Sequence, residues 1–206
     1  MYVPAHFAAD ESDVRELLTR HGAADLVTPT ASGLVATLLP FLYEPDAGPH
    51  GVLLGHVARN NPHWRAEPTG ESMVIVRGPD AYVSPGWYAS KAEHGRVVPT
   101  WNYVTAHVHG ELAVHDDPVW LEDLVRRLTA KHEGALGGSW SVDDAPERFV
   151  AGQLRAIVGV EVRISRVEAK LKLSQNRPEA DRVGVVAGLR ARGDVASAEA
   201  VARANR

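Results

Sequence analysis

Short apolar runs separated by turn residues recur through the first half of this chain, and they restrict its fold more than any other feature. The runs cover residues 24–28, 34–43, 52–57 and 72–76, and Pro and Gly residues stand between them. Short strands with close turns and few intervening helices favour an antiparallel sheet or barrel over βαβ units. We therefore expect a β-barrel core with peripheral helices, an α+β fold.

Two longer segments continue the strand pattern in the second half. Residues 157–167, running on towards Ser174, alternate apolar and polar side chains, and so do residues 101–109. In the 101–109 segment one face is mostly small or aliphatic, and the other carries Trp101, Tyr103, Thr105, His107 and His109. A face that is both aromatic and polar suits a ligand cleft or a subunit interface. The alternative is a strand packed on a helix with its hydroxyl groups satisfied.

Helical spacing of apolar residues and capping residues predict the helices. The segment 84–99 is rich in Pro, Gly and Ser, which predicts an ordered loop rather than a regular element. The expected helices are about residues 12–21, a short one within 60–66, one from Pro118 to about Lys131 stopped near Gly134, one at about 146–155, and two after Pro178 separated by Gly193 and Asp194.

Composition excludes several classes of protein. A chain of 206 residues with 45% hydrophobic residues is expected to form one domain with a real core. Because it contains no cysteine, disulfides, thiolate zinc sites and cysteine nucleophiles are excluded, and a reducing cytoplasm is the expected location. We expect no secretory signal and no membrane span, since no run approaches about 18 apolar residues. The net charge of −4 provides no global attraction to nucleic acid.

Two polar segments could bind an anion. Residues 55–61, GHVARNN, place a Gly, a cation and two amides between a strand and a helix start, where Arg59 and backbone N–H groups could hold a phosphate. The pattern matches neither the Walker nor the Rossmann glycine motif. Residues 170–178, KLKLSQNRP, place Lys170, Lys172 and Ser174 on one side of a strand. The alternatives are a solvated Arg beside a helix cap, and a charged edge strand.

Other chemistries have weaker signals. His107 and His109 lie two apart on one strand face, but a pair of His residues without a nearby acidic partner is a weak metal signal, so we expect no metal site. No G-x-S-x-G nucleophile motif occurs, and no carboxylate pair is distinguished.

Taken together, the motifs of this chain resemble those of a known family. They are MYVPAHF, ATLLPFLY, GHVARNNPHW, SPGWYASKAEHGRVVPTWNYV, WSVDDAP and KLKLSQNRPEADRVGVVAGL. They resemble the FMN-binding negative transcriptional regulators of the PaiB type, over residues 1–189. The resemblance implies the FMN-binding split-barrel fold, similar to pyridoxamine phosphate oxidases and flavin reductases. It also implies a homodimer with FMN in the groove between two subunits. Residues 1–175 would form the split-barrel domain and 176–206 a C-terminal helical extension, of which Arg190–Arg206 lie beyond the resemblance.

The resemblance also assigns site residues. It places the backbone of residues 36–40, including Leu38, along the isoalloxazine, with Thr37 near the phosphate or ribityl. His56, Arg59 and Asn60 match the turn that holds the ribityl phosphate. The groove wall offered by the other subunit would comprise Trp101, Asn102, Lys172, Ser174 and Gln175.

Two functions follow as expectations. The first is a flavin-dependent or flavin-sensing regulator, for which the family name implies DNA as a partner. Residues 176–206 carry six Arg against four acidic residues but present no obvious set of base-reading side chains. The second is an FMN-dependent oxidoreductase or flavin reductase, in which the cofactor supplies the redox chemistry. Haem or another planar ligand in the same groove is a third alternative.

Overall fold

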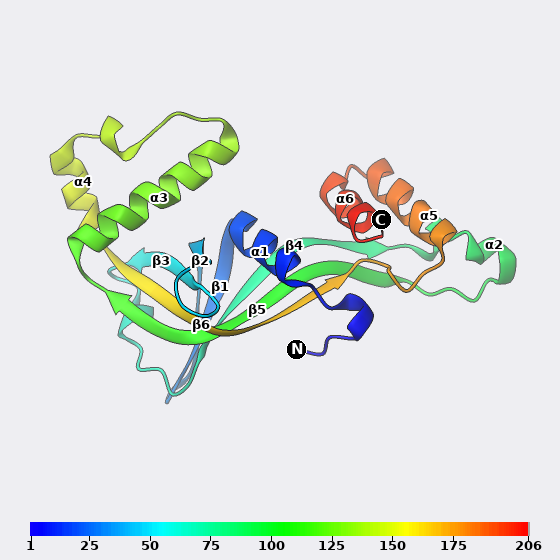
Figure 1. The fold of residues 1–206 in the computed structure, drawn as a ribbon, viewed down its shortest axis with the longest axis horizontal. Helices are drawn as coiled ribbons and strands as arrows, with labels where there is room; N and C mark the ends of the chain where they lie inside the picture. The colour runs from blue at the N-terminus through cyan, green and yellow to red at the C-terminus, as the bar shows by residue number, and fades with distance from the viewer. Residues whose placement is uncertain (206) are drawn as a thin grey trace. The chain divides into compact units, whose positions relative to one another are not determined.

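The computed structural model describes residues 1–205, and its six strands form a closed barrel in the order β1-β2-β3-β6-β5-β4 (Figure 1). The strands are β1 (Ala23–Thr30), β2 (Gly33–Glu44), β3 (Val52–Ala58), β4 (Ser72–Val83), β5 (Thr100–His115) and β6 (Ile157–Lys172). The described residues divide into two compact units. The barrel unit comprises residues 18–76 and 107–167, and the terminal unit comprises residues 1–17, 77–106 and 168–205. The strands β4, β5 and β6 each contribute residues to both units.

The barrel unit is built from antiparallel strand pairs. β1 pairs with β2 along its whole length, β2 with β3, and β3 with β6. Alternate side chains of these strands are fully buried, among them Leu26, Phe41 and Leu53. A Cβ on Gly55 would lie about 3 Å from both Leu39 and Phe41, so the absence of a side chain there lets the interior close. The predicted antiparallel barrel is confirmed.

Helix α3 (Pro118–Leu136) covers part of the barrel unit. Asp117 caps its first turn by accepting a hydrogen bond from the Val119 N–H, and Pro118 occupies the first helical position. Its apolar side packs Leu124 and Leu128 against Leu54 of β3. The prediction that this helix stops near Gly134 is wrong, because the left-handed residue that ends it is Gly137. A 3₁₀ turn η4 (Val142–Asp144) and helix α4 (Glu147–Leu154) follow.

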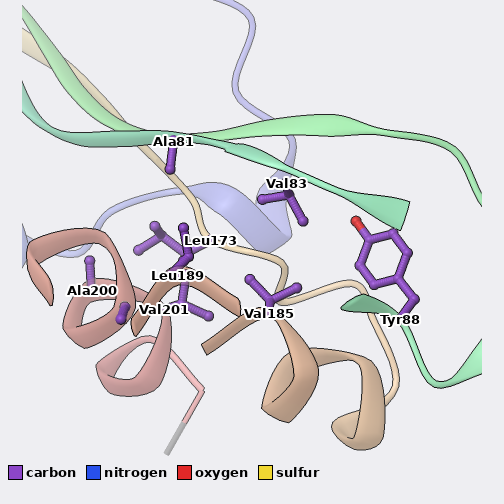
Figure 2. Packing of buried hydrophobic residues seen from close by; sticks show 9 residues of the cluster. Ala81, Val83, Tyr88, Leu173, Val185, Leu189, Ala200 and Val201 are labelled. Carbon is purple, nitrogen blue, oxygen red and sulfur yellow. The ribbon is translucent and has the colours of Figure 1, made fainter. Parts of the chain in front are cut away.

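The terminal unit has its own apolar core, which Figure 2 shows. Helices α5 (Glu179–Ala191) and α6 (Val195–Arg203) contribute Val185, Leu189, Ala198, Ala200 and Val201, and these pack against side chains of β4, of the following loop and of the end of β6. The two helices are separated at Gly193 and Asp194, as predicted. The 3₁₀ turn η1 (Ala5–Phe7) also belongs to this unit, and helix α1 (Glu11–Arg20) begins in it. The division of the chain at residue 175 stays a prediction.

Two segments differ from the sequence-based expectation. β4 extends beyond residue 76 to Val83, through a Gly–Pro pair. The segment 84–99, expected to contain no regular element, holds a 3₁₀ turn η3 (Pro85–Trp87) and a short helix α2 (Ser90–His94). The Ser84 side chain accepts the Gly86 N–H, and the left-handed Gly95 ends α2. The expectation of a loop without regular elements is therefore wrong for residues 85–87 and 90–94, which form short helical turns. The expected turn near residues 60–66 is η2 (Pro62–Arg65), capped by Asn61.

Among residues 1–205, no helix has the length and apolar character needed to cross a membrane.

Candidate functional site

A hydrogen-bonded network joins Thr37 of β2 to the turn η2. The Thr37 hydroxyl lies 2.8 Å from His63 Nδ1 and receives a hydrogen bond of 3.2 Å from Asn61 Nδ2. Asn61 also caps η2, since its Oδ1 accepts the His63 N–H. The motif GHVARNNPHW therefore does contact the strand ATLLPFLY, but through Asn61 and His63 rather than through Arg59 or Asn60.

The network continues from His63 to β1 and β4, within the barrel unit. His63 Nε2 lies 2.8 Å from the Thr28 hydroxyl, which lies 2.8 Å from the hydroxyl of Ser72. His63 is only 1% exposed, and its burial lowers its pKa. A buried neutral imidazole between two hydroxyl groups satisfies both of its nitrogens. His63 was not among the residues predicted from the sequence, although its position two residues after the capping Asn61 was an available signal.

Replacing His63 with Phe is expected to destabilise the protein. The ring volume is retained, but the hydroxyl groups of Thr28 and Thr37 lose their shared partner, which costs roughly 2 kcal/mol. Urea unfolding measures this change. The control Thr37→Ser keeps the hydroxyl and should lose less than half as much. Equal stability of His63→Phe and the wild type would contradict the role of the network.

The outward face of β2 exposes apolar side chains. Leu34 is 75% exposed and Leu38 is 65% exposed, and Ala36 between them is exposed as well. Thr37 points to the opposite side of the strand, towards His63. The structure thus separates the two adjacent residues predicted on this strand: Leu38 belongs to an open apolar surface, and Thr37 belongs to the buried network.

Arg59 is held by protein groups. Its guanidinium forms a two-pronged ion pair with Asp116, and it also donates to the carbonyls of Arg155 and Ile157. These hydrogen bonds use four of the five N–H groups of Arg59. The hydrogen bond to Asp116 also raises the pKa of Arg59. Asn60, beside it, is exposed. As the structure stands, Arg59 acts as a clamp that joins the ends of β3, β5 and β6.

His56 lies on the side of β3 that faces α3. It shares this face with Leu54, and its register partner is Gly159 of β6. The ring of Trp120 occupies the space that a side chain at position 159 would fill. His56 Nδ1 is buried and has no hydrogen-bond partner among the described residues, and burial lowers the pKa of the ring. An orphaned nitrogen of this kind is available to a ligand or a water.

Asn102, Ser174 and Gln175, three of the predicted site residues, stabilise the turn that follows β6. Asn102 Nδ2 donates to the Ser174 hydroxyl at 2.9 Å, and both residues are buried. Gln175 uses its amide locally, accepting from the Leu173 N–H and donating to the Leu171 carbonyl. Ser174 has a φ of 65°, a left-handed conformation that few residues adopt without support. These three side chains therefore support the backbone after β6.

Trp101 and Lys172 are presented to the outside. Trp101 is 50% exposed, and its Nε1 donates to Asp80 Oδ1 at 2.8 Å. Lys172 is half-buried, and its Nζ donates to the Thr100 hydroxyl at 2.6 Å. The predicted alternation of β5 is confirmed, because Asn102, Ala106 and Val108 are buried. On the aromatic and polar face, Trp101, Tyr103 and Thr105 line a hollow.

The loop after β4 is fixed by α5. The buried carboxylate of Asp181 accepts hydrogen bonds from both the backbone N–H and the hydroxyl of Ser90. The ring of Trp87 fills the space beside Gly188, and its backbone carbonyl fills the space beside Gly184. The motifs SPGWYAS and NRPEADRVGVVAGL thus occur together because they form one packed interface within the terminal unit.

In residues 1–205, no group of three or more His, Cys, Asp or Glu side chains is arranged to hold a metal ion.

Comparison with known proteins identifies the family. Residues 1–166 match the model of a family described as "Putative FMN-binding domain". The chain belongs to this family. The match includes the β2 strand, the GHVARNN turn and the VPTWNY segment, so most of the predicted site residues fall within it.

Two relatives match over most of their length. The protein "Protease synthase and sporulation protein PAI 2" of Bacillus subtilis is 29% identical over 90% of this chain and 87% of its own. An uncharacterized protein of Emericella nidulans, AN0679, is 30% identical over 91% of this chain and 90% of its own.

Solved structures confirm the fold. The crystal structure of the conserved hypothetical protein Rv2991 from Mycobacterium tuberculosis gives a TM-score of 0.58 at 12% identity, over 87% of this chain and 95% of that one. The flavocytochrome Anf3 from Azotobacter vinelandii gives a TM-score of 0.57 at 14% identity, over 82% and 72%. The fold is the FMN-binding split barrel, as predicted, and the family assignment confirms FMN as the cofactor that was expected.

The residues present fit FMN in part. The exposed apolar face around Leu34 and Leu38 suits a planar ring, and the orphaned His56 Nδ1 is a polar group without a partner among residues 1–205. Arg59 is not placed to hold the phosphate, because Asp116 and the carbonyls of Arg155 and Ile157 together accept from four of its five N–H groups.

Proposed function

We propose that this protein is a flavin-binding regulator of the PaiB type that acts as a homodimer. The observation that carries the proposal is the family match over residues 1–166, which spans β1 to β5 and the first part of β6. The similarity to the sporulation protein of Bacillus subtilis supports a regulatory role, and the cysteine-free composition supports a cytoplasmic location.

In this proposal the apolar face of β2 holds the flavin ring. Leu34, Ala36 and Leu38 offer an exposed surface that costs free energy in water and would be covered by the isoalloxazine or by a second copy of the chain. His63 fixes the hydroxyl of Thr37, and Asn61 donates to the same oxygen. With His63 protonated on Nδ1, both lone pairs of Thr37 Oγ1 receive hydrogen bonds, which fixes this side chain on the side of β2 opposite to the proposed ring site.

A bound FMN would supply hydride or single-electron transfer. In this proposal the chain's own contribution is to bind and orient the flavin. Trp101 and Lys172 are the predicted groove residues whose side chains are presented outwards, and they stay candidates for the wall offered by the other subunit. Asn102, Ser174 and Gln175 would position that wall rather than contact the flavin.

The C-terminal helices offer little for direct reading of DNA. In α6, Ser197, Ala198, Ala200 and Val201 are buried against the terminal unit's core. On the exposed side Arg203 pairs with Glu16. Recognition of bases needs side-chain donors and acceptors that reach a groove. The regulatory role would therefore be exerted through flavin or a partner protein, and absence of specific operator retardation at low salt would agree with this.

Flavin binding is tested by thermal and chemical unfolding in the presence of FMN. A ligand that binds only the folded state adds about 2.7 kcal/mol of stability at a hundredfold excess over its dissociation constant. We expect FMN to raise the melting temperature and the purified protein to absorb in the visible blue. A colourless protein whose melting temperature does not respond to FMN would overturn the cofactor assignment.

A matched pair of variants locates the site. Leu38→Asp places a charge on the exposed β2 face and should abolish the FMN-dependent stabilisation while leaving the protein folded, since Leu38 makes little core contact. Val183→Asp, an equally exposed aliphatic residue of α5, serves as the control and should retain it.

The second candidate, an FMN-dependent oxidoreductase, is tested in the same preparation. Oxidation of NADH or NADPH by the FMN-loaded protein, followed at 1:1 flavin occupancy, would favour it over the regulator. An FMN-saturated dimer without turnover would exclude it.

A further inference from the structure

A hollow opens on one face of the strands of the terminal unit. It has a volume of about 320 Å³ and is lined by Arg77, Gly78, Asp80, Trp101, Tyr103, Val104 and Thr105. Ligand sites range from roughly 300 to 1,000 Å³, so this hollow matches a small molecule of one or two rings. All of its residues belong to β4 and β5 within the one unit.

Aromatic side chains form its walls, and they are held in place. The indole of Trp101 is fixed at its nitrogen by Asp80, and Tyr82 packs against it edge-on, with ring centres 6.2 Å apart. Trp101 nevertheless leaves half of its surface in solvent. A rigid, half-exposed indole provides a stacking surface for a planar ring at little cost in side-chain entropy.

Two ammonium groups stand beside the hollow. Lys172 Nζ lies 5.9 Å and Lys170 Nζ 5.4 Å from the centre of the Tyr103 ring, which is a wall of the hollow. Neither lysine has a carboxylate within ion-pair distance among residues 1–205. Lys170, 8% exposed, donates to the Tyr2 carbonyl and lies over the rings of Tyr2 and Phe7 as well.

The two lysines differ in how far their neighbours already compensate the ammonium group. The rings and the carbonyl around Lys170 compensate much of its charge. Lys172 donates to a single neutral oxygen, that of Thr100, although an ammonium has three N–H groups. Two donors of Lys172 are thus available to an anion.

We propose that this hollow binds a planar aromatic anion. The ring of the ligand would lie against Trp101 and Tyr103, and its oxyanion would accept hydrogen bonds from Lys172. The chemistry fits an aromatic carboxylate, and it also fits the phosphate end and ring of a flavin. The site goes beyond the flavin assignment because it is complete within the terminal unit and does not need the apolar face of β2.

Binding is measured by isothermal titration calorimetry with 2-naphthoate and its uncharged isostere 2-naphthamide, on the full chain without flavin. A charged hydrogen bond to a ligand oxyanion is worth enough for the carboxylate to bind about tenfold more tightly than the amide. Equal affinities, or no binding of either at millimolar concentration, would overturn the proposal.

Variants separate the charge from the stacking surface. Lys172→Gln should weaken naphthoate about tenfold and leave naphthamide unchanged, whereas Trp101→Leu should weaken both. Lys91→Gln, at an exposed lysine of the same unit, is the control and should change neither. Loss of naphthoate affinity in the control, or its retention in Lys172→Gln, would contradict the assigned roles.

Competition with FMN and with riboflavin shows whether the bound anion is the flavin phosphate or a second ligand. Naphthoate is titrated into protein saturated with FMN, and separately with riboflavin, which has the same ring without the phosphate. Displacement by FMN but not by riboflavin would show that the anion is the flavin phosphate. Unchanged naphthoate binding in both would show a second ligand. If the wild type binds no flavin but binds naphthoate more tightly than naphthamide, the proposed flavin function is wrong and the proposed anion site is supported.

Discussion

Gly184→Ala is expected to destabilise the terminal unit by roughly 2–3 kcal/mol, an unusually large effect for a single methyl group in a helix. A Cβ at position 184 would lie 1.9 Å from the backbone carbonyl oxygen of Trp87, and backbone cannot rotate away as a side-chain end can. Either α5 or the loop carrying Trp87 must shift. The hydrogen bonds from Ser90 to Asp181 oppose that shift, because they fix the same loop to the same helix.

The same substitution elsewhere provides the control. Gly134 is also helical, in α3, but a Cβ there would meet nothing within 4 Å. Because Ala favours a helix over Gly by up to about 1 kcal/mol, Gly134→Ala should be neutral or stabilising. Urea unfolding of the two variants should therefore give changes of opposite sign. Two changes of the same sign and size would show that helix propensity, and not the close approach of Trp87, decides the result.

Stability is expected to fall steeply between pH 6.5 and about 4, and His21 is the main cause. Burial, together with a smaller contribution from the charge of Lys131, lowers the pKa of His21 from 6.5 to about 4. Lys131 is held nearby by the carbonyls of His21 and Phe41. In the unfolded chain the imidazole takes up a proton below pH 6.5, whereas in the folded chain it stays neutral down to about 4.

The sign follows from proton binding. The unfolded state binds more protons than the folded state in this pH window. The contribution of His21 to the free energy of unfolding is therefore fully present above pH 6.5 and is lost as the pH falls. The loss is about 3 kcal/mol at most. The lowered pKa values of His56 and His63, both caused by burial, act in the same direction. Urea unfolding at half-unit pH steps measures the slope.

Two variants test the assignment to His21. His21→Leu should flatten the pH dependence, and His50→Gln, which removes an exposed imidazole, should retain it. If His21→Leu does not fold, an NMR titration of the His21 ring in the wild type gives the same information. A midpoint near 6.5 for that ring would contradict the prediction.

The sequence by itself determined the architecture of this protein. Period-two alternation in 101–109 and 157–167 put Ala106, Val108, Val160 and Val162 in the core, where the structure has them. Turn residues separated the strands correctly, because Pro and Gly restrict or permit backbone angles locally. The motifs also sufficed to identify the family, since they cover most of the chain.

Tertiary structure alone decided what the polar residues do. The neighbours of Arg59 in sequence suggest a phosphate anchor, but Asp116, 57 residues away, and two backbone carbonyls accept four of its five N–H groups. Thr37 and Leu38 are adjacent in sequence and yet point to opposite sides of β2. The network of His63 and the packing of Trp87 on Gly184 join segments far apart in the chain. Local sequence patterns report backbone conformation, whereas a polar side chain's role depends on which distant donor or acceptor the fold places beside it.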